Sequence, residues 1–324
     1  MNSIRIIAPA HLHVGNIDMN GDLGRLYGTV GFTIDFPRTI IEISKSSEGI
    51  EIIGNDSENA RKYANIIIRK FNIDDGFKIH IRDNIPVGIG MGSQTALSLS
   101  IGIGILRLCN MDFDMEELAL CMGRSKITAL GINSFRYGGF LIDAGYRINE
   151  KGSHVPPLIF RQDIPEDWLF IVCIPEKPIP KIMRIKERED EILESLEVME
   201  RELSCELSRI VLMQMMPSII ERNIETFGKS ITALNRKLGN FWDEFQSDIY
   251  CDPIVSRGIK MMEKFTYGVC QSCWGPTFYG ILDSEERARK LVNVMQRFLN
   301  ENGGGEVFYT KPNNRGAISE WSGR

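Results

Sequence analysis

The 324-residue sequence has no excess of positive charge and no long apolar run, which excludes several classes of protein. Its 38 Lys and Arg residues are outnumbered by 43 Asp and Glu residues, and the net charge of −5 argues against a broad surface for nucleic acid or anionic membranes. The apolar run from Ala96 to Leu108 is too short, and too interrupted by Ser and Gly, to span a bilayer. The amino terminus has no basic segment ahead of a long apolar core. We therefore predict a cytoplasmic protein that binds neither nucleic acid nor a membrane.

The seven cysteines and four histidines are too scattered to indicate a disulfide framework or a structural metal centre. An odd number of cysteines spread over a long chain is typical of free thiols in a reducing compartment. Cys270 and Cys273 form a Cys-x-x-Cys pair, but a zinc site needs two more ligands and no second cysteine pair lies nearby. We interpret these two residues as incidental thiols.

The two standard phosphate-binding motifs are absent as well. No Gly-Lys-Ser/Thr ending gives a Walker loop, and no acidic residue follows where a Rossmann ribose site requires it. Instead, three glycines alternate with apolar residues between Pro86 and Ser93, directly ahead of a stretch of helix formers. Such a loop lets backbone N–H groups approach an anion, and the helix start adds unpaired donors and the positive end of a dipole. The pattern predicts a phosphate site, although close packing against a buried helix remains an alternative for the glycines alone.

The chain is long enough for two domains, each with its own core. Residues alternate at strand spacing over Gly76–Arg82, and helical spacing is found over Glu58–Phe71. The passage around Pro156 and Pro157 is the best candidate for a linker, which predicts domains at residues 1–157 and 158–324. Because each predicted helix needs a sheet face to bury its apolar stripe, we predict an α+β protein.

Three segments of the chain resemble a known family. The sequence Pro-x-Gly-x-Gly-x-Gly-Ser at Pro86 to Ser93 resembles the central motif of the GHMP small-molecule kinase superfamily. The segment from His11 to Arg25, which begins His-Leu-His-Val-Gly-Asn-Ile-Asp, and the segment Gln-Ser-Cys-Trp-Gly-Pro-Thr from Gln271 are similar to one branch of it, the β-ribofuranosylaminobenzene 5'-phosphate synthases. The tail from Pro312 to Ala317 also resembles that family's ending. The resemblance therefore covers the whole length of the chain.

This resemblance implies a GHMP kinase-like two-domain fold, in which a domain similar to ribosomal protein S5 domain 2 precedes a ferredoxin-like domain and the site lies between them. It implies an enzyme of methanopterin biosynthesis that joins phosphoribosyl pyrophosphate to a hydroxy- or aminobenzoate and releases CO2 and pyrophosphate. The implied cofactor is Mg2+ or another divalent metal, and ATP is not consumed. The expected partners are these small-molecule substrates, with a homodimer as the default assembly.

The resemblance and the side-chain chemistry together give candidate site residues. The loop N–H groups, with a metal, would hold the diphosphate, and arginines would clamp a carboxylate or the 5'-phosphate through their bidentate fork. Histidines suit hydrogen bonding or proton transfer. The catalytic candidates are His11, His13, Asp18 and Arg25. The phosphate-binding candidates are Gly88, Gly90, Gly92, Ser93, Gln94 and Thr95. The substrate-binding candidates are Arg136, Trp274 and Arg315, and the metal candidates are Ser93 and Asp18.

Two other functions remain open at this point. A small-molecule kinase would use the same loop, but kinases of this superfamily place an aspartate ahead of a Gly-Gly strand, and no carboxylate lies between Ser125 and Tyr137. A non-catalytic ligand-binding paralogue is the third alternative, because Gln94 occupies the position of a hydroxyl that helps hold magnesium in the kinases. Each candidate residue also has a structural alternative, since histidines in strands and exposed arginines often serve stability alone.

Overall fold

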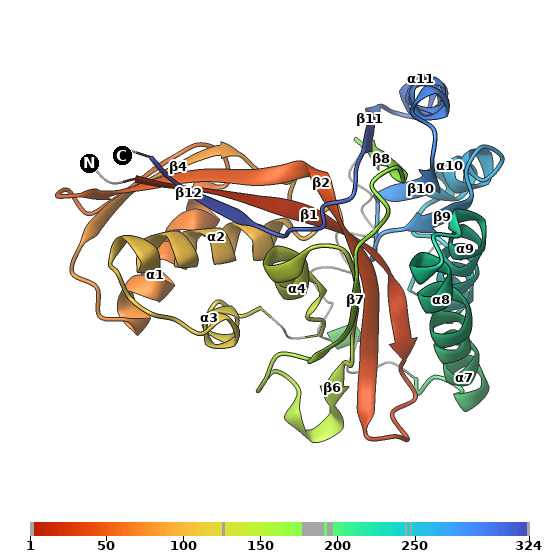
Figure 1. Ribbon diagram of the computed structural model, residues 1–324, viewed down its shortest axis with the longest axis horizontal. Coiled ribbons are helices and arrows are strands. Elements are labelled where there is room, and N and C mark those ends of the chain that lie inside the picture. Colours follow the sequence, from red (N-terminus) through yellow and green to blue (C-terminus); the bar gives the residue numbers. More distant parts are fainter. Residues whose placement is uncertain are drawn as a thin grey trace.

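The computed structural model describes residues 3–124, 127–176, 191–192, 197–243, 245–246 and 248–322. They form an eight-stranded sheet, a four-stranded sheet and the helices that cover them (Figure 1). Two long antiparallel strands, β1 (Ser3–Asp18) and β2 (Arg25–Ser46), extend from the left side of the molecule to its middle and there turn toward its lower edge (Figure 1).

The eight-stranded sheet is built on β1 and β2. Its other strands are β3 (Ile50–Ile53), β4 (Gly76–Asp83), β5 (Phe140–Asp143), β6 (Tyr146–Arg147), β7 (Leu158–Gln162) and β12 (Ile318–Ser322). The main order is β12-β1-β2-β4-β3, while β5 pairs with β2 and β7, and β6 pairs with the start of β2. Buried and partly exposed residues alternate along the first half of β1, because only one face of the strand meets the core. β12 brings the carboxyl terminus beside the amino terminus (Figure 1).

Helices cover one face of this sheet. They are α1 (Ser57–Lys70), α2 (Ser93–Leu108), α3 (Met115–Cys121) and α4 (Leu130–Tyr137), followed by the short helix η1 (Ile148–Glu150). α2 is buried on nearly all sides, which fits its apolar sequence and its place between the sheet and the other helices (Figure 1). The predicted helix behind the glycine loop is confirmed, as are the predicted helix near residues 58–71 and the strand near residues 76–82.

The four-stranded sheet has the order β11-β8-β10-β9, and all of its pairs are antiparallel. Its strands are β8 (Leu169–Pro175), β9 (Gly268–Gln271), β10 (Phe278–Leu282) and β11 (Gly305–Thr310). The helices of this half are α7 (Arg201–Ile210), η2 (Val211–Met215), α8 (Met216–Ile220), α9 (Ile224–Phe241), α10 (Pro253–Met262) and α11 (Glu285–Glu301). Helices thus separate β8 from β9 and β10 from β11, which is the split β-α-β pattern of a ferredoxin-like domain and confirms that prediction.

The helical stretch Arg201–Ile220 is, by length and composition alone, apolar enough to cross a membrane. A core helix of a soluble protein passes the same test, and here Leu207, Val211 and Met215 are buried in the main hydrophobic core. The alternately charged sequence from Arg184 and the apolar sequence that follows it predict one long helix to about Asn223, and residues 184–190 and 193–196 of it lie outside the described residues. Within the described part, α7 begins only at Arg201.

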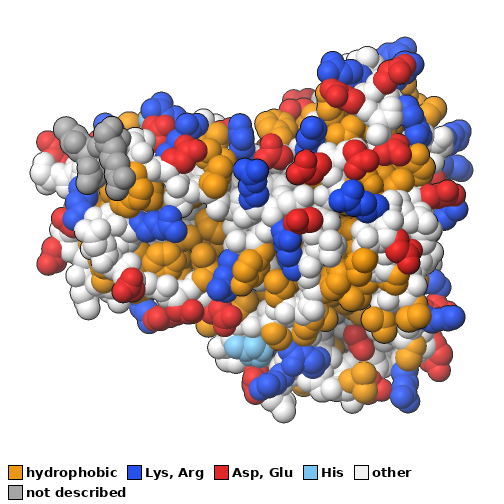
Figure 2. All heavy atoms as spheres, viewed as in Figure 1, with side chains coloured by type: hydrophobic (Ala, Val, Ile, Leu, Met, Phe, Trp, Pro, Cys, Tyr) orange, Lys and Arg blue, Asp and Glu red, His pale blue; other side chains and the backbone are white. Residues whose placement is uncertain are grey.

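The two halves share a continuous aromatic core. The ring of Phe32 on β2 lies 5.8 Å from that of Phe140 on β5, 5.2 Å from that of Phe170 on β8 and 5.8 Å from that of Tyr279 on β10. The predicted division at residue 157 stays a prediction, and both β7 and β12, which follow that residue, pair within the first sheet. On the face in Figure 2, acidic and basic side chains are interspersed instead of forming a field of one sign.

Candidate active site

A cavity of about 350 Å³ lies where β1, the glycine loop, α4, α9 and the segment after β9 meet. It is lined by His11, His13, Val14, Gly15, Asn16, Tyr27, Gly90, Gly92, Thr95, Ile127, Thr128, Gly131, Ile132, Asn235, Leu238, Gly239, Trp242, Gln246, Ile249, Tyr250, Gln271, Cys273 and Trp274. None of these lining residues is Asp, Glu, Lys or Arg. Six of the residues predicted from the sequence line this cavity: His11, His13, Gly90, Gly92, Thr95 and Trp274.

The glycine loop presents backbone to this cavity. Gly88, Gly90 and Gly92 have φ values of 81°, 83° and 81°, a left-handed conformation that glycine adopts without strain. Gly92 is the N-cap of α2 and no side chain caps the helix, so its first N–H groups have no intrahelical partner. The imidazole of His11 lies directly over Gly92, where an added Cβ would be 2.1 Å from the His11 Cε1 atom. The start of α2 therefore has donors of the kind that anion-binding sites use.

Ser272 joins the three segments that carry the family resemblance. Its hydroxyl donates a hydrogen bond of 2.7 Å to the Gly90 carbonyl and accepts one of 3.0 Å from the His13 N–H. Its side chain is fully buried. One side chain of the late segment thus fixes the glycine loop to the histidine strand, with each hydroxyl contact made to backbone.

The two histidines are neutral at pH 7. Burial lowers the pKa of His13 from 6.5 to about 4. Burial, and then repulsion from His13, lower the pKa of His11 from 6.5 to about 3. Among the described residues neither ring has a hydrogen-bond partner, although the His13 carbonyl accepts from the Tyr279 hydroxyl at 3.2 Å. Each ring therefore offers one N–H donor and one acceptor to a ligand.

Two amide side chains hold the part of the cavity wall that α9 and β9 contribute. Asn235 of α9 donates to the carbonyls of Val14 and Gln271 and accepts from the Gln271 N–H, so it ties β1 to β9. The Gln271 side chain accepts from the Cys251 N–H at 2.8 Å and donates to the Gln246 side chain at 3.0 Å. These bonds fix the segment that closes the cavity after α9.

Asp143 anchors the wall formed by the start of α4. Its carboxylate accepts hydrogen bonds from the N–H groups of Thr29, Ala129 and Gly145 and from the Thr128 hydroxyl. Burial still raises the pKa of Asp143, from 3.8 to about 6, because its cost outweighs the four donors. Since Thr128 lines the cavity and Asp143 does not, we interpret Asp143 as a positioning residue.

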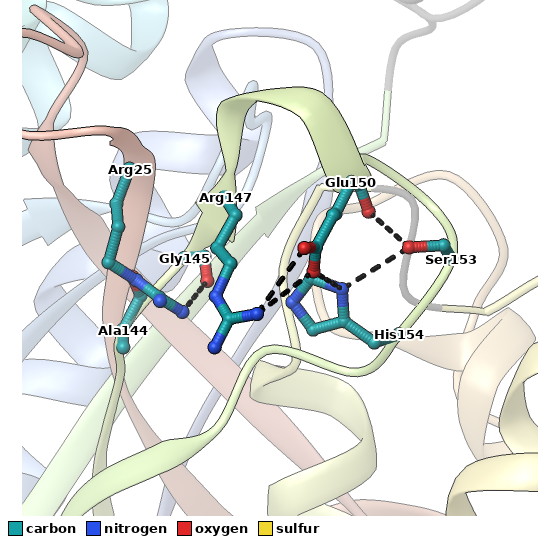
Figure 3. Close-up of polar contacts among 7 residues, drawn as sticks. All are labelled: Arg25, Ala144, Gly145, Arg147, Glu150, Ser153 and His154. Carbon is teal, nitrogen blue, oxygen red and sulfur yellow. Dashed lines mark hydrogen bonds and ion pairs between the residues drawn. The ribbon is translucent and has the colours of Figure 1, made fainter.

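Asp18 and Arg25 lie outside the cavity lining, although they belong to the same sequence segment as the histidines. The Asp18 carboxylate accepts from the Asn20 N–H at 2.8 Å and from the Ser204 hydroxyl at 3.0 Å, and lines a separate depression beside α7. The Arg25 guanidinium donates to the carbonyls of Ala144 and Gly145, both at 2.9 Å (Figure 3). Both side chains are used by the protein itself, which favours the structural alternative for them.

The remaining predicted residues also lie outside the cavity lining. Arg136 and Arg315 are exposed and do not line the cavity, and the Arg136 guanidinium stacks 4.8 Å from the centre of the Tyr137 ring. Gln94 turns toward α1, where its side-chain oxygen accepts from the Tyr63 hydroxyl. Gly88 and the buried Ser93 belong to the loop but not to the cavity lining.

The described residues contain no group of three or more His, Cys, Asp or Glu side chains that could hold a metal ion. The predicted metal ligands Ser93 and Asp18 are not brought together, because Asp18 is bonded to Ser204. The donors near the loop that fit a hard cation are the hydroxyls of Ser93 and Thr95. Mg2+ commonly keeps several waters and binds through substrate phosphates, which these hydroxyls would supplement.

Several lining residues were not predicted. Tyr27, Thr128, Asn235, Trp242 and Gln246 come from segments without a recognisable motif. Asn16, Gln271 and Cys273 do lie in the resembling segments, and their place in those segments was the available signal. For Trp242, the only available signal was its residue type, because the sequence has just four tryptophans.

Comparison with known proteins shows the family. Residues 58–139 match the family model of the GHMP kinases N terminal domain, and residues 215–301 match that of GHMP kinases C terminal. A beta-ribofuranosylphenol 5'-phosphate synthase from Methanothermobacter thermautotrophicus is 31% identical, with 97% of each chain covered. The chain belongs to the beta-ribofuranosylphenol 5'-phosphate synthase family. The same name is carried by a relative from Methanocaldococcus jannaschii, 30% identical over 96% of this chain and 98% of its own.

Membership of this synthase family confirms the predicted family and the prediction of an enzyme of the transferase type. The fold is similar to that of solved kinases of the GHMP superfamily. A homoserine kinase from Cytophaga hutchinsonii superposes with a TM-score of 0.69 at 16% identity, over 98% of this chain and 97% of that one. A mevalonate kinase from Methanococcus jannaschii superposes with a TM-score of 0.65 at 15% identity, over 96% and 98%. These likenesses confirm the predicted GHMP kinase-like α+β fold, and together the relatives imply a soluble protein with small-molecule substrates.

Proposed function

We propose that this protein joins phosphoribosyl pyrophosphate to 4-hydroxybenzoate with release of CO2 and pyrophosphate, and so makes a ribofuranosylphenol 5'-phosphate, the product that the name of its relatives gives. The observation that carries the proposal is a cavity whose lining includes both the glycine loop and two tryptophan side chains. Such a cavity suits a diphosphate donor and an aryl acceptor held in contact.

The reaction exchanges one bond at the sugar and one at the ring. The bond between the anomeric carbon and the diphosphate oxygen breaks, and both electrons leave with pyrophosphate. The ring carbon that carries the carboxylate attacks the anomeric carbon. The bond to the carboxylate then breaks, CO2 leaves, and its electrons restore the aromatic ring. The acceptor's para hydroxyl assists because it donates electron density to the attacking carbon.

The residues of the chain supply positioning and hydrogen bonds for these steps. The N–H groups at the start of α2, which no side chain caps, would stabilise the negative charge on the departing pyrophosphate. The ring N–H groups of His11 and His13 face the same space, and as neutral donors they bind without a counter-ion. Ser272 keeps the loop and the histidines in one geometry.

Mg2+ is part of this proposal as a cofactor that neutralises the diphosphate. The hydroxyls of Ser93 and Thr95 would complete its coordination beside substrate oxygens and water. We further propose a cytoplasmic location, a place in methanopterin biosynthesis and a homodimer as the assembly, none of which requires a nucleic-acid or membrane partner.

The test is incubation of the purified full-length protein with phosphoribosyl pyrophosphate, Mg2+ and either 4-hydroxybenzoate or 4-aminobenzoate. We expect equal amounts of pyrophosphate and CO2 and a new arylribose phosphate by mass spectrometry. Absence of all three products with both acceptors, in protein that is folded by circular dichroism, would reject the synthase activity.

A small-molecule kinase is the second candidate, because the fold and the glycine loop are shared with GHMP kinases. The segment at the kinase base position is the start of α4, and Leu130–Tyr137 contains no carboxylate. The nearby Asp143 is buried and already accepts four hydrogen bonds. ATP consumption with a polyol, amino-alcohol or hydroxy-acid acceptor would favour the kinase, and binding without any turnover would favour a non-catalytic paralogue.

A further inference from the structure

The cavity lining is of two kinds. The glycine loop and the start of α2 contribute small residues, Gly90, Gly92 and Thr95. Other segments contribute large side chains, of which Trp242 and Trp274 are the largest. A highly charged diphosphate and a planar aryl ring therefore meet different surfaces.

The two tryptophans form a rigid wall. Their ring centroids lie 4.7 Å apart with an interplanar angle of 69°, the edge-to-face arrangement that aromatic pairs prefer. Trp274 is only 8% exposed and packs in a small cluster with Ile192. Trp242 is half-buried and contacts the rings of Phe241 at 5.2 Å and Phe245 at 6.4 Å. The wall thus keeps its shape before a ligand arrives, which lowers the entropic cost of binding.

Glycines bring the segment after α9 close to this wall. A Cβ on Gly239 would lie 2.4 Å from the Ile249 carbonyl oxygen, and one on Gly275 would lie 2.6 Å from the Cys251 sulfur. Gln271 fixes the segment, because its side chain accepts from the Cys251 N–H and donates to Gln246. The Gln271 side chain is therefore engaged with protein groups, while both tryptophans line the cavity.

The wall is also next to the loop. A Cβ on Gly90 would lie 2.6 Å from the Ser272 carbonyl oxygen and 3.5 Å from the Cys273 Cβ, so the segment that carries Trp274 rests on the loop itself. A carbon–carbon bond between the two substrates needs them in van der Waals contact. A ring lying against Trp242 and Trp274 would meet this requirement toward a sugar whose diphosphate lies at the loop.

We infer that the Trp242–Trp274 wall is the acceptor subsite and that Trp242 makes it selective for a planar aromatic carboxylate over a saturated ring of similar shape. The inference rests on the proposed function for the identity of the acceptor. Stacking provides the selectivity, because a flat ring covers the indole faces more fully than a puckered one.

The test is calorimetric titration of the full-length protein without phosphoribosyl pyrophosphate, so that no turnover occurs. The ligands are 4-hydroxybenzoate and trans-4-hydroxycyclohexanecarboxylate, in the presence of Mg2+ and pyrophosphate. We expect the wild type to bind the aromatic ligand about tenfold more tightly, which corresponds to ~1.4 kcal/mol. Equal binding of the two ligands would overturn the inference without any variant, and so would no binding of 4-hydroxybenzoate.

Substitutions of Trp242 test whether this side chain is responsible for the preference for the aromatic ligand. Trp242→Leu should weaken 4-hydroxybenzoate about tenfold, Trp242→Phe should keep it within about threefold, and neither should change the affinity for pyrophosphate. The matched control is Trp321→Leu, because Trp321 is 51% exposed on β12 and does not line the cavity. Unchanged acceptor binding in folded Trp242→Leu, or an equal loss for pyrophosphate, would overturn the assignment.

Failure of the proposed function gives a different pattern. A protein that binds 4-hydroxybenzoate through Trp242 but releases no pyrophosphate or CO2 retains the subsite and loses the synthase activity. A protein that turns over both substrates, with acceptor KM and affinity unchanged by Trp242→Leu, retains the activity and loses the subsite.

Discussion

The middle and the tip of the β1–β2 hairpin lie in one sequence segment but have opposite roles. In the middle, His11 and His13 face the cavity with rings that have no partner among the described residues. At the tip, Asp18 accepts two hydrogen bonds and Arg25 donates two, all within the protein. His13 lines the cavity, whereas Asp18, five residues further along the strand, lines a separate depression beside α7. One sequence segment can therefore contain side chains that face a cavity and side chains that are already engaged by the fold.

The largest expected difference between middle and tip concerns two glycines with the same backbone conformation. Gly92→Ala places a methyl group 2.1 Å from the His11 ring, at a φ of 81°. We expect kcat/KM to fall at least about 100-fold, because the loop or the imidazole must move by about 1 Å or more. Steady-state kinetics of pyrophosphate release measures this.

The matched change at the tip is Gly24→Ala, where φ is 82° and nothing lies within 4 Å of an added Cβ. It should cost only the strain of the left-handed conformation, about 1–2 kcal/mol of stability, with unchanged activity. Similar loss of activity in both variants would mean that backbone strain, and not the contact with His11, explains the effect.

The next effect concerns two buried serines. Ser272→Ala leaves the Gly90 carbonyl and the His13 N–H without their shared partner, which should cost about 1–3 kcal/mol of stability and lower kcat/KM roughly tenfold. Ser204→Ala, which removes a bond to Asp18 at the tip, should cost comparable stability and no activity. Thermal melts together with kinetics separate the two, and an inactive Ser204→Ala protein with normal stability would return the tip to the active site.

A third difference appears on acidification. The folded-state pKa values of His11 and His13, about 3 and about 4, lie below the unfolded value of 6.5, so the unfolded chain binds more protons between these limits. The stability that the neutral rings provide is complete above pH 6.5 and is lost as the pH falls toward 4, by up to ~1.4 kcal/mol per unit for each ring. Denaturant titrations between pH 7 and 5 measure this loss.

The double variant His11→Gln/His13→Gln should show a flatter pH dependence than the wild type. Asp143 acts in the opposite direction between pH 3.8 and about 6, because its folded-state pKa is raised, but it is present in both proteins and cancels in the difference. Parallel pH curves would show that the histidines are not buried in the way the structure has them.

The smallest effect on activity is expected for the arginines. Arg25→Ala loses two bonds to carbonyl groups and should cost about 1–2 kcal/mol of stability, with KM for phosphoribosyl pyrophosphate unchanged within about twofold. Arg136→Ala and Arg315→Ala should change neither quantity measurably, because both side chains are exposed and outside the cavity lining. A tenfold rise of KM in any of the three would identify a substrate clamp.

The sequence predicted the parts of the site that depend on local backbone chemistry. Alternating glycines ahead of helix formers predicted the loop and α2, and the short segments around His13 and Trp274 were sufficient to indicate the family. It did not predict Tyr27, Asn235 or Trp242, because these residues reach the cavity through packing of β2 and α9 and carry no local pattern. Asp18, Arg25, Arg136 and Arg315 stay predictions as ligand-binding residues; they lie outside the cavity lining, and the partners that satisfy a charge are not visible in a linear chain.

By itself, the sequence determined the α+β fold, the loop that exposes backbone N–H groups and the family, because periodicity, glycine positions and short motifs are properties of neighbouring residues. Only the tertiary structure decided which polar groups remain available to a ligand. That choice depends on contacts such as Ser272 with Gly90, and Ser204 with Asp18, between residues more than 180 positions apart. A polar side chain binds a ligand or holds the fold according to whether a distant segment already satisfies it.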